Sequence, residues 1–464
     1  MSNRKFDCKT YFPDKVAIIG AAKSGIAATR YFIEHGVSVV ISDLCSSEHL
    51  EKIIVRNNLS GCQYEGGGHT DSILDTDLIV ISPGVPSDLP ILLKARQRTI
   101  PVWSEMELGF RASRAPFLAV TGSSGKSTTV SLTGAALAAA GIEHVVAGNI
   151  GIPVISAVPA ISKNGFIVAE VSSFQLETID RFQPYAAVVL NLLKNHLDRY
   201  PSEKEYFKVK KEIARNLTPD NYLLLNANDP LLASWGKEMA DKTRVLYFGA
   251  NVAGSDSFWC EGTVLRFRHN GKEITVGDCK EMMIHGRHNY ENASVAAALA
   301  VIAGADSEAI YRGLCEFKGL PHRLEFVATI NGVSWFNDSK STTAESVDCA
   351  IKAFSGRVHL IAGGKDKGCD FSVVDASIKN NVKDIVLIGE AAERMKKQWD
   401  GMVPITIAPT LKDAVSIVYG KTTADESVVF SPGCSSFDMF KNYEDRGDRF
   451  RDIVQDLLIR GKVL

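Results

Sequence analysis

The feature that most constrains this chain is an apolar run that leads directly into a short polar loop and then into a long helical pattern. Residues 117–120 (FLAV) have the composition of a buried strand, and residues 129–140 (TVSLTGAALAAA) that of a helix rich in small side chains. The loop between them, TGSSGKST at 121–128, carries the Gly-Lys-Ser of a phosphate-binding loop, although Val120 stands where the pattern G-x-x-x-x-G-K-[ST] has glycine. A strand followed by such a loop and then directly by a helix predicts a largely parallel α/β sheet.

This phosphate loop, residues 121–128, predicts how a nucleoside triphosphate would be held. Backbone N–H groups at the start of the helix, together with the positive end of its dipole, would face the β and γ phosphates. Lys126 would neutralise charge on the terminal phosphate, and the hydroxyl of Ser127 would coordinate Mg²⁺. An ordinary glycine-rich turn is the alternative. The residues expected to contact the phosphates are Gly122, Ser123, Ser124, Gly125, Lys126, Ser127 and Thr128.

Strand, turn and helix patterns also occur on both sides of this loop, which predicts three α/β domains. A chain of 464 residues is long enough for about three domains of roughly 150 residues each. We expect a Rossmann-like domain at 1–112, a central domain similar to phosphate-loop ATPases with a mostly parallel sheet at 113–320, and a C-terminal Rossmann-like domain at 321–464. An antiparallel insert is expected at 258–284, where the pattern alternates around an Asn-Gly turn.

Composition argues against several kinds of partner. The 52 basic and 54 acidic side chains nearly cancel, so no broad positive field is available for nucleic acid or for an anionic membrane. The nine cysteines show neither a C-x-x-C pair nor the spacing of a zinc site, which indicates reduced thiols. The first residues lack the apolar core of a signal peptide. We therefore expect a cytoplasmic protein without nucleic-acid or membrane partners, and we expect a monomer.

A second turn rich in small residues, GAAKSG at 20–25, gives a weaker signal. It follows an apolar strand, and Asp43 ends the next strand about twenty residues later, as in dinucleotide-binding domains. Ala22 stands where the dinucleotide fingerprint has glycine, which disfavours a nicotinamide dinucleotide. Three interpretations stay open here: the phosphates of another nucleotide, a nicotinamide dinucleotide, or a purely structural turn.

Other polar residues follow predicted strands or lie near a predicted boundary. Glu170 ends the apolar part of FIVAEVSS and could bind Mg²⁺ beside the loop, with a structural glutamate as the alternative. His196 follows the strand AAVVLNLL, where it is either a metal ligand or a structural residue. HNYENA and PHRLE offer Asn289, Asn292 and Arg323. Arg323 could reach a triphosphate across a domain boundary, or form a surface salt bridge.

Taken together, these motifs resemble those of the Mur ligases, ATP-dependent enzymes that build the peptide of bacterial cell-wall precursors. The last three of the matching motifs point, within the family, to the member that adds D-glutamate. The resemblance extends along nearly the whole chain and keeps the family order of motifs, which are GAAKSG, ISPGVP, TGSSGKST, GNIG, EVSSFQLE, NHLDRYPS, HNYENA, GLPHRLE, NDSKSTT, GGKDKGCDF and SPGCSSFDMFKNYEDRG.

The resemblance implies a ligase reaction in peptidoglycan precursor synthesis. The γ-phosphoryl group of ATP would pass to the terminal carboxylate of UDP-N-acetylmuramoyl-L-alanine and give an acyl phosphate. The amine of D-glutamate would then attack the acyl carbon, and phosphate would leave. Because a carboxylate is a poor electrophile and two anions must meet, Mg²⁺ and Lys126 would have to neutralise charge.

The resemblance also implies a role for individual positions. The expected catalytic residues are Lys126, His196, Lys210 and Lys340, with Lys210 carbamylated as in family members. The expected Mg²⁺ ligands are Ser127, Glu170, His196 and Lys210, and the further ATP contacts are Asn289, Asn292, Arg323 and Asp338. The UDP substrate would contact Lys23, Ser24, Asp43, Gly84 and Asn149, and D-glutamate would contact Thr342, Lys367, Ser436 and Tyr443.

Some positions depart from the family pattern. Lys194 and Asn195 precede His196 where an acidic residue is usual, which leaves the second metal position open. Leu44 and Cys45 stand where a polar and a basic residue are expected, which leaves the uracil contacts open.

Other activities are compatible with parts of the chain. They are another Mur or folylpolyglutamate-type ligase, a phosphate-loop ATPase or small-molecule kinase, a nicotinamide dehydrogenase, and a non-enzymatic nucleotide-binding module. The C-terminal motif and the lysines at 340 and 367 favour the D-glutamate-adding ligase over these.

Overall fold

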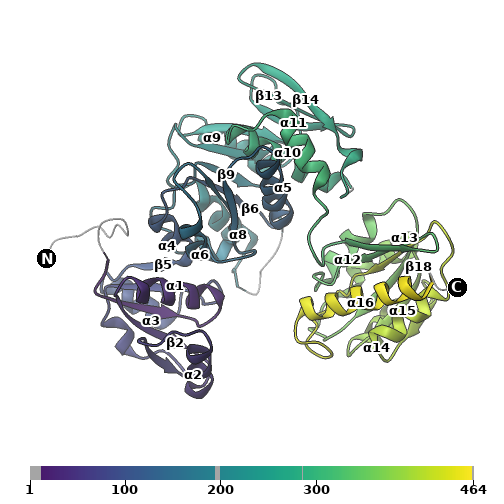
Figure 1. Ribbon diagram of the computed structural model, residues 1–464, viewed down its shortest axis with the longest axis horizontal. Helices are drawn as coiled ribbons and strands as arrows, with labels where there is room; N and C mark the ends of the chain where they lie inside the picture. The colour runs from purple at the N-terminus through teal and green to yellow at the C-terminus, as the bar shows by residue number, and fades with distance from the viewer. Residues whose placement is uncertain (1–11, 194–198, 285, 462–464) are drawn as a thin grey trace. The chain divides into compact units, whose positions relative to one another are not determined.

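The computed structural model describes residues 12–193, 199–284 and 286–461. The chain divides into two compact units (Figure 1). The first takes in the chain up to Met282 together with Arg287–Phe317, and the second takes in Met283–Gly286 and the chain from Lys318 onward. The first two expected domains thus share one unit, and the boundaries expected for the three domains stay predictions.

The N-terminal sheet is wholly parallel, with strand order β3-β2-β1-β4-β5. Successive residues of its central strand pack into two different cores, Val16 and Ile18 into one and Ala17 and Ile19 into the other. The sheet is therefore buried on both faces, which explains the near-continuous apolar runs of the sequence. Its strands are β1 (Lys15–Ile19), β2 (Ser38–Asp43), β3 (Gln63–Gly66), β4 (Leu78–Ile81) and β5 (Val102–Ser104). Its helices are α1 (Lys23–Glu34), α2 (Ser47–Arg56), α3 (Pro90–Gln97) and α4 (Glu105–Ala112).

Helix α4 joins this part of the first unit to the middle sheet. The buried carboxylate of Glu107 accepts the backbone N–H groups of Asp180, Arg181 and Phe182, each at 2.9 Å. It also accepts from Nε of Arg111 at 2.6 Å. Since a buried carboxylate with this many donors is firmly held, α4 fixes the two sheets within one unit.

The middle sheet has the order β14-β13-β12-β11-β10-β9-β6-β8-β7. It is parallel from β7 through β12, and β13 and β14 add to its edge in antiparallel fashion, which confirms the expected insert. Its strands are β6 (Phe117–Thr121), β7 (His144–Gly148), β8 (Phe166–Glu170), β9 (Ala186–Val189), β10 (Tyr222–Asn226), β11 (Arg244–Phe248), β12 (Ser257–Glu261), β13 (Val264–His269) and β14 (Lys272–Asp278).

Three helices of this part, α5, α10 and α11, pack against one another (Figure 1). Helix α5 begins directly after the phosphate loop, and its small residues allow the close approach of α10, which is itself rich in alanine. The helices are α5 (Lys126–Ala139), α6 (Val154–Ala157), α7 (Ser173–Leu176), α8 (Glu203–Lys211), α9 (Pro230–Met239), α10 (Arg287–Ile302) and α11 (Ser307–Glu316).

The second unit contains a sheet of order β15-β16-β20-β17-β18-β19, in which only the β15–β16 pair is antiparallel. Its strands are β15 (Glu325–Ile330), β16 (Val333–Asn337), β17 (Val358–Gly363), β18 (Val382–Ile388), β19 (Ile405–Ile407) and β20 (Ser427–Phe430). Its helices are α12 (Ala344–Lys352), α13 (Asp375–Asn381), α14 (Ala392–Gln398), α15 (Leu411–Tyr419) and α16 (Tyr443–Gly461). The three α/β sheets confirm the predicted fold class. Within the described ranges, no helix combines the length and the apolar composition that crossing a bilayer requires.

Candidate active site

The phosphate loop lies between β6 and α5, as the sequence predicts. Gly122 has a φ of +153° and Gly125 a φ of +84°, values that glycine adopts without strain. A Cβ atom at Gly122 would lie 2.9 Å from Cβ of Leu190, and one at Gly125 would lie 2.7 Å from Oδ1 of Asn292. Both positions therefore require glycine, because neighbouring segments approach the loop backbone closely.

Two lysines converge on the loop. Nζ of Lys126 donates to the carbonyl of Gly122 at 2.9 Å and lies 3.4 Å from that of Ser123. Nζ of Lys210, on α8, donates to the same Gly122 carbonyl at 2.9 Å. Burial, followed by the nearby charge of Lys126, lowers the pKa of Lys210 to about 6, although Glu170 opposes the shift. Lys210 is only 1 % exposed, and its lowered pKa favours the neutral amine.

Glu170 ends β8, the strand beside β6, so its buried carboxylate lies near the loop edge of the sheet. Oε1 accepts from Nδ2 of Asn149 at 2.7 Å, whereas buried Oε2 has no hydrogen-bond partner within the described part of the chain. A buried carboxylate oxygen that lacks a donor suits a cation, so Glu170 fits its expected role. Among the described residues, no group of three or more His, Cys, Asp or Glu side chains is arranged so that it could hold a metal ion. Mg²⁺ needs none, because it commonly binds one or two protein groups together with phosphates and water.

The asparagines of HNYENA lie on the first turns of α10. Oδ1 of Asn292 accepts from Oγ1 of Thr129 at 3.2 Å, and the same hydroxyl donates to the carbonyl of Gly125 at 3.0 Å. Nδ2 of Asn292 lies 3.4 Å from Oδ1 of Asn289. The structure therefore brings both residues to the helix end of the loop, where the sequence placed them.

The other end of the loop is held by Asn191, which the sequence analysis missed. Its Oδ1 accepts the backbone N–H groups of Ser123 and Ser124, each at 3.0 Å, and its Nδ2 donates to the carbonyl of Ser124 at 3.2 Å. Asn191 follows β9, so its place at the carboxyl end of a parallel strand was a signal that could have identified it.

In the N-terminal sheet, the 20–25 turn is tightly packed and is hydrogen-bonded to Asp43. A Cβ at Gly25 would lie 1.8 Å from the carbonyl oxygen of Gly20, so the strand and helix backbones nearly touch. The Asp43 carboxylate accepts the N–H groups of Ala21 at 2.7 Å and Cys45 at 2.8 Å. These hydrogen bonds outweigh burial and lower the pKa of Asp43.

The remaining residues expected to contact the UDP substrate surround this turn. Lys23 and Ser24 open α1, and Gly84 lies in the loop after β4. That loop approaches the turn, because Oγ of Ser82 donates to the carbonyl of Gly20 at 2.9 Å. The structure therefore groups Lys23, Ser24, Asp43 and Gly84, while Asn149 lies beside Glu170 at the middle sheet.

In the second unit, the expected residues follow three neighbouring parallel strands. Lys340 and Thr342 come after β16, Ser436 after β20, and Lys367 after β17, which are adjacent in the order β16-β20-β17. Ligands of open parallel sheets bind at the carboxyl ends of strands. The strand order thus brings these four positions, together with Tyr443 at the start of α16, to one edge of the sheet.

Asp338 is buried at this edge. Its carboxylate accepts from Oγ of Ser341 at 2.5 Å, Oγ of Ser431 at 2.8 Å and the N–H of Leu324 at 3.1 Å. Burial raises its pKa to about 6 despite these donors. Through these hydrogen bonds Asp338 connects the ends of β16 and β20 to the turn that carries Arg323. Its contact with ATP stays a prediction.

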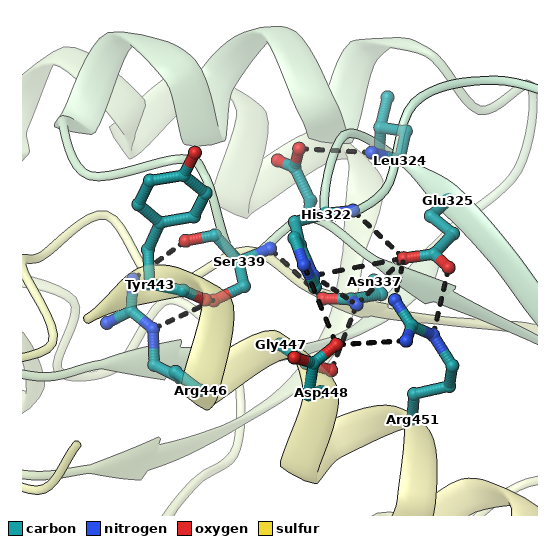
Figure 2. Close-up of polar contacts among 11 residues, drawn as sticks. His322, Leu324, Glu325, Asn337, Ser339, Tyr443, Arg446, Gly447, Asp448 and Arg451 are labelled. Carbon is teal, nitrogen blue, oxygen red and sulfur yellow. Dashed lines mark hydrogen bonds and ion pairs between the residues drawn. The ribbon is translucent and has the colours of Figure 1, made fainter. Parts of the chain in front are cut away.

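Figure 2 shows how the start of α16 is fastened to this edge. Nδ2 of Asn337 lies 3.1 Å from Nδ1 of His322, 3.0 Å from Oε2 of Glu325 and 3.1 Å from the carbonyl of Gly447. Nε and Nη2 of Arg451 donate to the two oxygens of Glu325 at 3.0 and 3.2 Å. The network joins the turn at 320–325, the end of β16 and α16.

A fully buried arginine, Arg446, joins the loops after β16 and β20, and Figure 2 shows its contact with Ser339. It donates to Oγ and the carbonyl of Ser339 at 3.0 and 2.8 Å, and to the carbonyls of Cys434 and Ser435 at 3.0 and 3.2 Å. Lys340 and Tyr443 are brought together beside it, with Nζ of Lys340 5.5 Å from the centre of the tyrosine ring. Arg446 lies within the motif SPGCSSFDMFKNYEDRG, but the sequence analysis gave it no role, because its partner Ser339 lies 107 positions away in the chain.

The expected ATP contacts are divided between the units. The loop, Asn289 and Asn292 belong to the first unit, whereas Arg323 and Asp338 belong to the second. His196, with Lys194 and Asn195 before it, lies outside the described residues.

The fold and these sites define a class: an α/β protein of three sheets, with a phosphate loop at the carboxyl end of strand β6 of the middle sheet. Three family models match in order: the Mur ligase MurD-like N-terminal domain at residues 14–104, the Mur ligase middle domain at 120–300, and the Mur ligase glutamate ligase domain at 322–434. The chain belongs to the Mur ligase family, and it is therefore an enzyme of the ligase class.

Relatives support this assignment, and solved structures share the fold. The chain is 42 % identical to a UDP-N-acetylmuramoylalanine–D-glutamate ligase of Acidobacterium capsulatum, over 95 % of this chain and 96 % of the relative. It is 38 % identical to the ligase of the same name from Geotalea daltonii, over 96 % of this chain and 97 % of the relative.

The fold is similar to that of two solved structures. The crystal structure of MurC from Thermotoga maritima has a TM-score of 0.59 and 18 % identity, with 95 % of this chain and 99 % of that chain covered. The crystal structure of MurF from Acinetobacter baumannii has a TM-score of 0.61 and 18 % identity, with 96 % of this chain and 93 % of that chain covered.

Proposed function

We propose that this protein is the ligase that adds D-glutamate to UDP-N-acetylmuramoyl-L-alanine with consumption of ATP, a step of peptidoglycan precursor synthesis. The observation that carries the proposal is its similarity, over at least 95 % of its length, to ligases of that name. A cytoplasmic location and a monomeric state accompany the proposal as predictions.

The reaction joins a carboxylate to an amine. The terminal carboxylate of the UDP substrate attacks the γ-phosphorus of ATP, ADP leaves, and an acyl phosphate forms. The amine of D-glutamate attacks the acyl carbon and loses a proton, and inorganic phosphate leaves with the C–O bond electrons. Activation is needed because a carboxylate anion resists nucleophilic attack, and it demands cationic groups where two anions meet.

The phosphate loop suits the triphosphate. The first N–H groups of α5 have no acceptor within the helix, and the helix dipole favours an anion at this end. Lys126 folds back over the loop carbonyls and would turn toward the terminal phosphate when ATP binds.

Mg²⁺ would be held by Ser127 and Glu170, with His196 and Lys210 at a second position. The metal supplies charge neutralisation for the phosphates. The unpartnered Oε2 of Glu170 supports the first assignment. Burial and a neutral amine support carbamylation of Lys210, in which the amine adds CO₂ and releases a proton.

The other substrates are assigned to strand ends of the N-terminal sheet and of the sheet of the second unit. The UDP end is assigned to Lys23, Ser24, Asp43 and Gly84, with Asn149 toward the reacting end. D-glutamate is assigned to Thr342, Lys367, Ser436 and Tyr443, and Lys340 to the reaction centre. These assignments are supported by the clustering of each set at one sheet edge, apart from Asn149, which lies beside Glu170 at the middle sheet.

The test is phosphate release from ATP by the purified protein supplied with UDP-N-acetylmuramoyl-L-alanine, with and without D-glutamate, with the product weighed by mass spectrometry. We expect phosphate release to depend on both substrates and one amide product to form. Phosphate release that ignores D-glutamate, as from a simple ATPase, would contradict the proposal.

Lys126→Ala should lower kcat by roughly a hundredfold or more, because the charge that stabilises phosphoryl transfer is lost. Lys163→Ala is the matched control, since Lys163 is an exposed lysine of the same unit. Near-normal kcat in Lys126→Ala would show that the triphosphate binds elsewhere.

A further inference from the structure

We propose that Asn191 is a positioning residue of the phosphate loop. Its carboxamide holds Ser123 and Ser124, the first half of the loop, so that the second half, residues 125–128, is set to receive the triphosphate. The inference rests on the proposed use of ATP at this loop, and it adds a residue to which neither the motifs nor the family resemblance gave a role.

The sheet order brings Asn191 to the loop. Strand β9 lies beside β6, where Val189 pairs with Thr121, and the N–H of Leu190 donates to the carbonyl of Thr121 at 2.9 Å. A Cβ at Gly122 would lie 2.9 Å from Cβ of Leu190. The segment that leaves β9 therefore runs alongside the loop, with no room for a side chain between the two backbones.

The carboxamide uses both of its ends on the loop. Oδ1 accepts the N–H groups of Ser123 and Ser124 at 3.0 Å each, while Nδ2 donates to the carbonyl of Ser124 at 3.2 Å. The hydroxyl of Ser123 adds contacts to the backbone of Leu193, at 3.0 Å from its N–H and 2.8 Å from its carbonyl. The segment 191–193 thus fixes the backbone conformation of the phosphate loop at Ser123 and Ser124.

This arrangement divides the loop into a held half and a binding half. The N–H groups of Ser123 and Ser124, which the sequence analysis expected to contact the phosphates, donate to Asn191 instead. The inference therefore assigns the anion to the N–H groups at the start of α5. It also accounts for Val120 in place of the usual glycine: Val120 belongs to strand β6, and the conformation of the loop is enforced from the neighbouring strand.

Only an amide satisfies both contacts. The asparagine carboxamide carries both an acceptor, Oδ1, and a donor, Nδ2. Aspartate has the same shape and keeps the acceptor, but it loses the donor and adds a negative charge near the phosphates. An alanine removes the side-chain acceptor of the Ser124 N–H, and it leaves the Ser123 N–H only the backbone carbonyl of residue 191, at 3.2 Å. These differences allow the positioning role to be separated from a general loss of structure.

The experiment compares wild type with Asn191→Ala, Asn191→Asp and the control Asn226→Ala. Asn226 ends the next strand, β10, and donates to the carbonyl of Leu190 at 3.4 Å without contacting the loop. Two readouts on the whole protein are binding of a fluorescent methylanthraniloyl ATP and hydrogen exchange of the peptide that spans 121–128.

We expect Asn191→Ala to bind the nucleotide about tenfold more weakly and to exchange faster in this peptide, the change that loss of one or two hydrogen bonds produces. Asn191→Asp should keep the slow exchange but bind more weakly, with a deficit that shrinks as salt is added. Asn226→Ala should match wild type in both readouts.

Equal or tighter nucleotide binding by Asn191→Ala, with unchanged exchange, would overturn the inference. If Asn191→Ala fails to fold, Asn191→Asp decides, because fast exchange in that variant would show that the acceptor contacts do not hold the loop. A wild-type protein that binds no ATP would defeat the proposed function, while the exchange data would still decide the role of Asn191.

Discussion

At the residue scale, burial changes the chemistry of one lysine among three neighbours on α8. Lys208 is exposed, Lys211 lies over the ring of Trp235, and Lys210 is buried against the loop carbonyl of Gly122. The pKa of Lys210, lowered to about 6 by burial and then by Lys126, keeps its amine neutral above that pH. A neutral buried amine can add CO₂, whereas a solvated lysine is protonated at pH 7.

We therefore expect protein equilibrated with ¹³C-bicarbonate at pH 8 to show one carbamate carbon by NMR, and the signal to fade as the pH falls below about 6. The signal should vanish in Lys210→Ala and persist in Lys208→Ala. Its survival in Lys210→Ala, or its absence from wild type, would count against the carbamate.

At the scale of elements, the packing of α16 against the turn at 320–325 requires glycine at position 447. A Cβ at Gly447 would lie 2.1 Å from Nδ1 of His322, a residue already held at φ +63°. Gly447→Ala should lower the free energy of unfolding of the second unit by about 1–3 kcal/mol, the usual cost of overpacking. Urea unfolding followed by tryptophan fluorescence measures this, since Trp335 lies 6.3 Å from Phe450 of α16.

The control for Gly447→Ala is Gly420→Ala at the end of α15, where the nearest atoms to an added Cβ are 3.7 Å away. We expect that variant to unfold within about 0.5 kcal/mol of wild type. Equal stability of the two variants would mean that α16 shifts without cost.

Three strands of the second sheet meet at a buried histidine. Nδ1 of His359 lies 2.8 Å from Asp384, and Nε2 lies 3.0 Å from Glu426, which also pairs with Lys383. Burial alone would lower the pKa of His359, but its hydrogen bonds to the two carboxylates outweigh burial and raise it.

The stabilising contribution of His359 is therefore complete below its unfolded pKa of about 6.5 and is lost as the pH rises through the higher folded value. We expect the free energy of unfolding to fall over that interval, and the slope to flatten in His359→Gln. Urea unfolding at a series of pH values measures both, and identical slopes would exclude this histidine as the source.

At the scale of the whole molecule, two compact units predict unfolding in more than one step. Calorimetry of wild type should resolve two transitions, and Gly447→Ala should lower the midpoint of one while leaving the other in place. A single transition that moves as a whole would mean that the units unfold cooperatively.

Much of the site was accessible from sequence because its signals are local. The loop at 121–128 has its strand, its glycines and its helix within a short segment, and the strands around it are apolar because both sheet faces are buried. Glu170 and Asn292 were predicted for the same reason, since each lies at the end of a predicted strand or the start of a predicted helix, and their roles stay predictions.

Residues that act across the fold escaped this reasoning. Asn191 reaches the loop because β9 is the neighbour of β6, and Arg446 reaches the carbonyls of Ser339 and Ser435 because β16 and β20 are adjacent. The order of strands in a sheet follows from how whole layers pack, so it cannot be predicted from a short stretch of sequence.

The sequence by itself determined the three α/β patterns, the phosphate loop and the family, because periodicity and glycine geometry are properties of neighbouring residues. The tertiary structure alone showed which asparagine holds the loop and which arginine joins the strand ends, and it supplied the burial that lowers the pKa of Lys210. Each of those outcomes depends on burial or on hydrogen bonds between segments that only folding brings into contact.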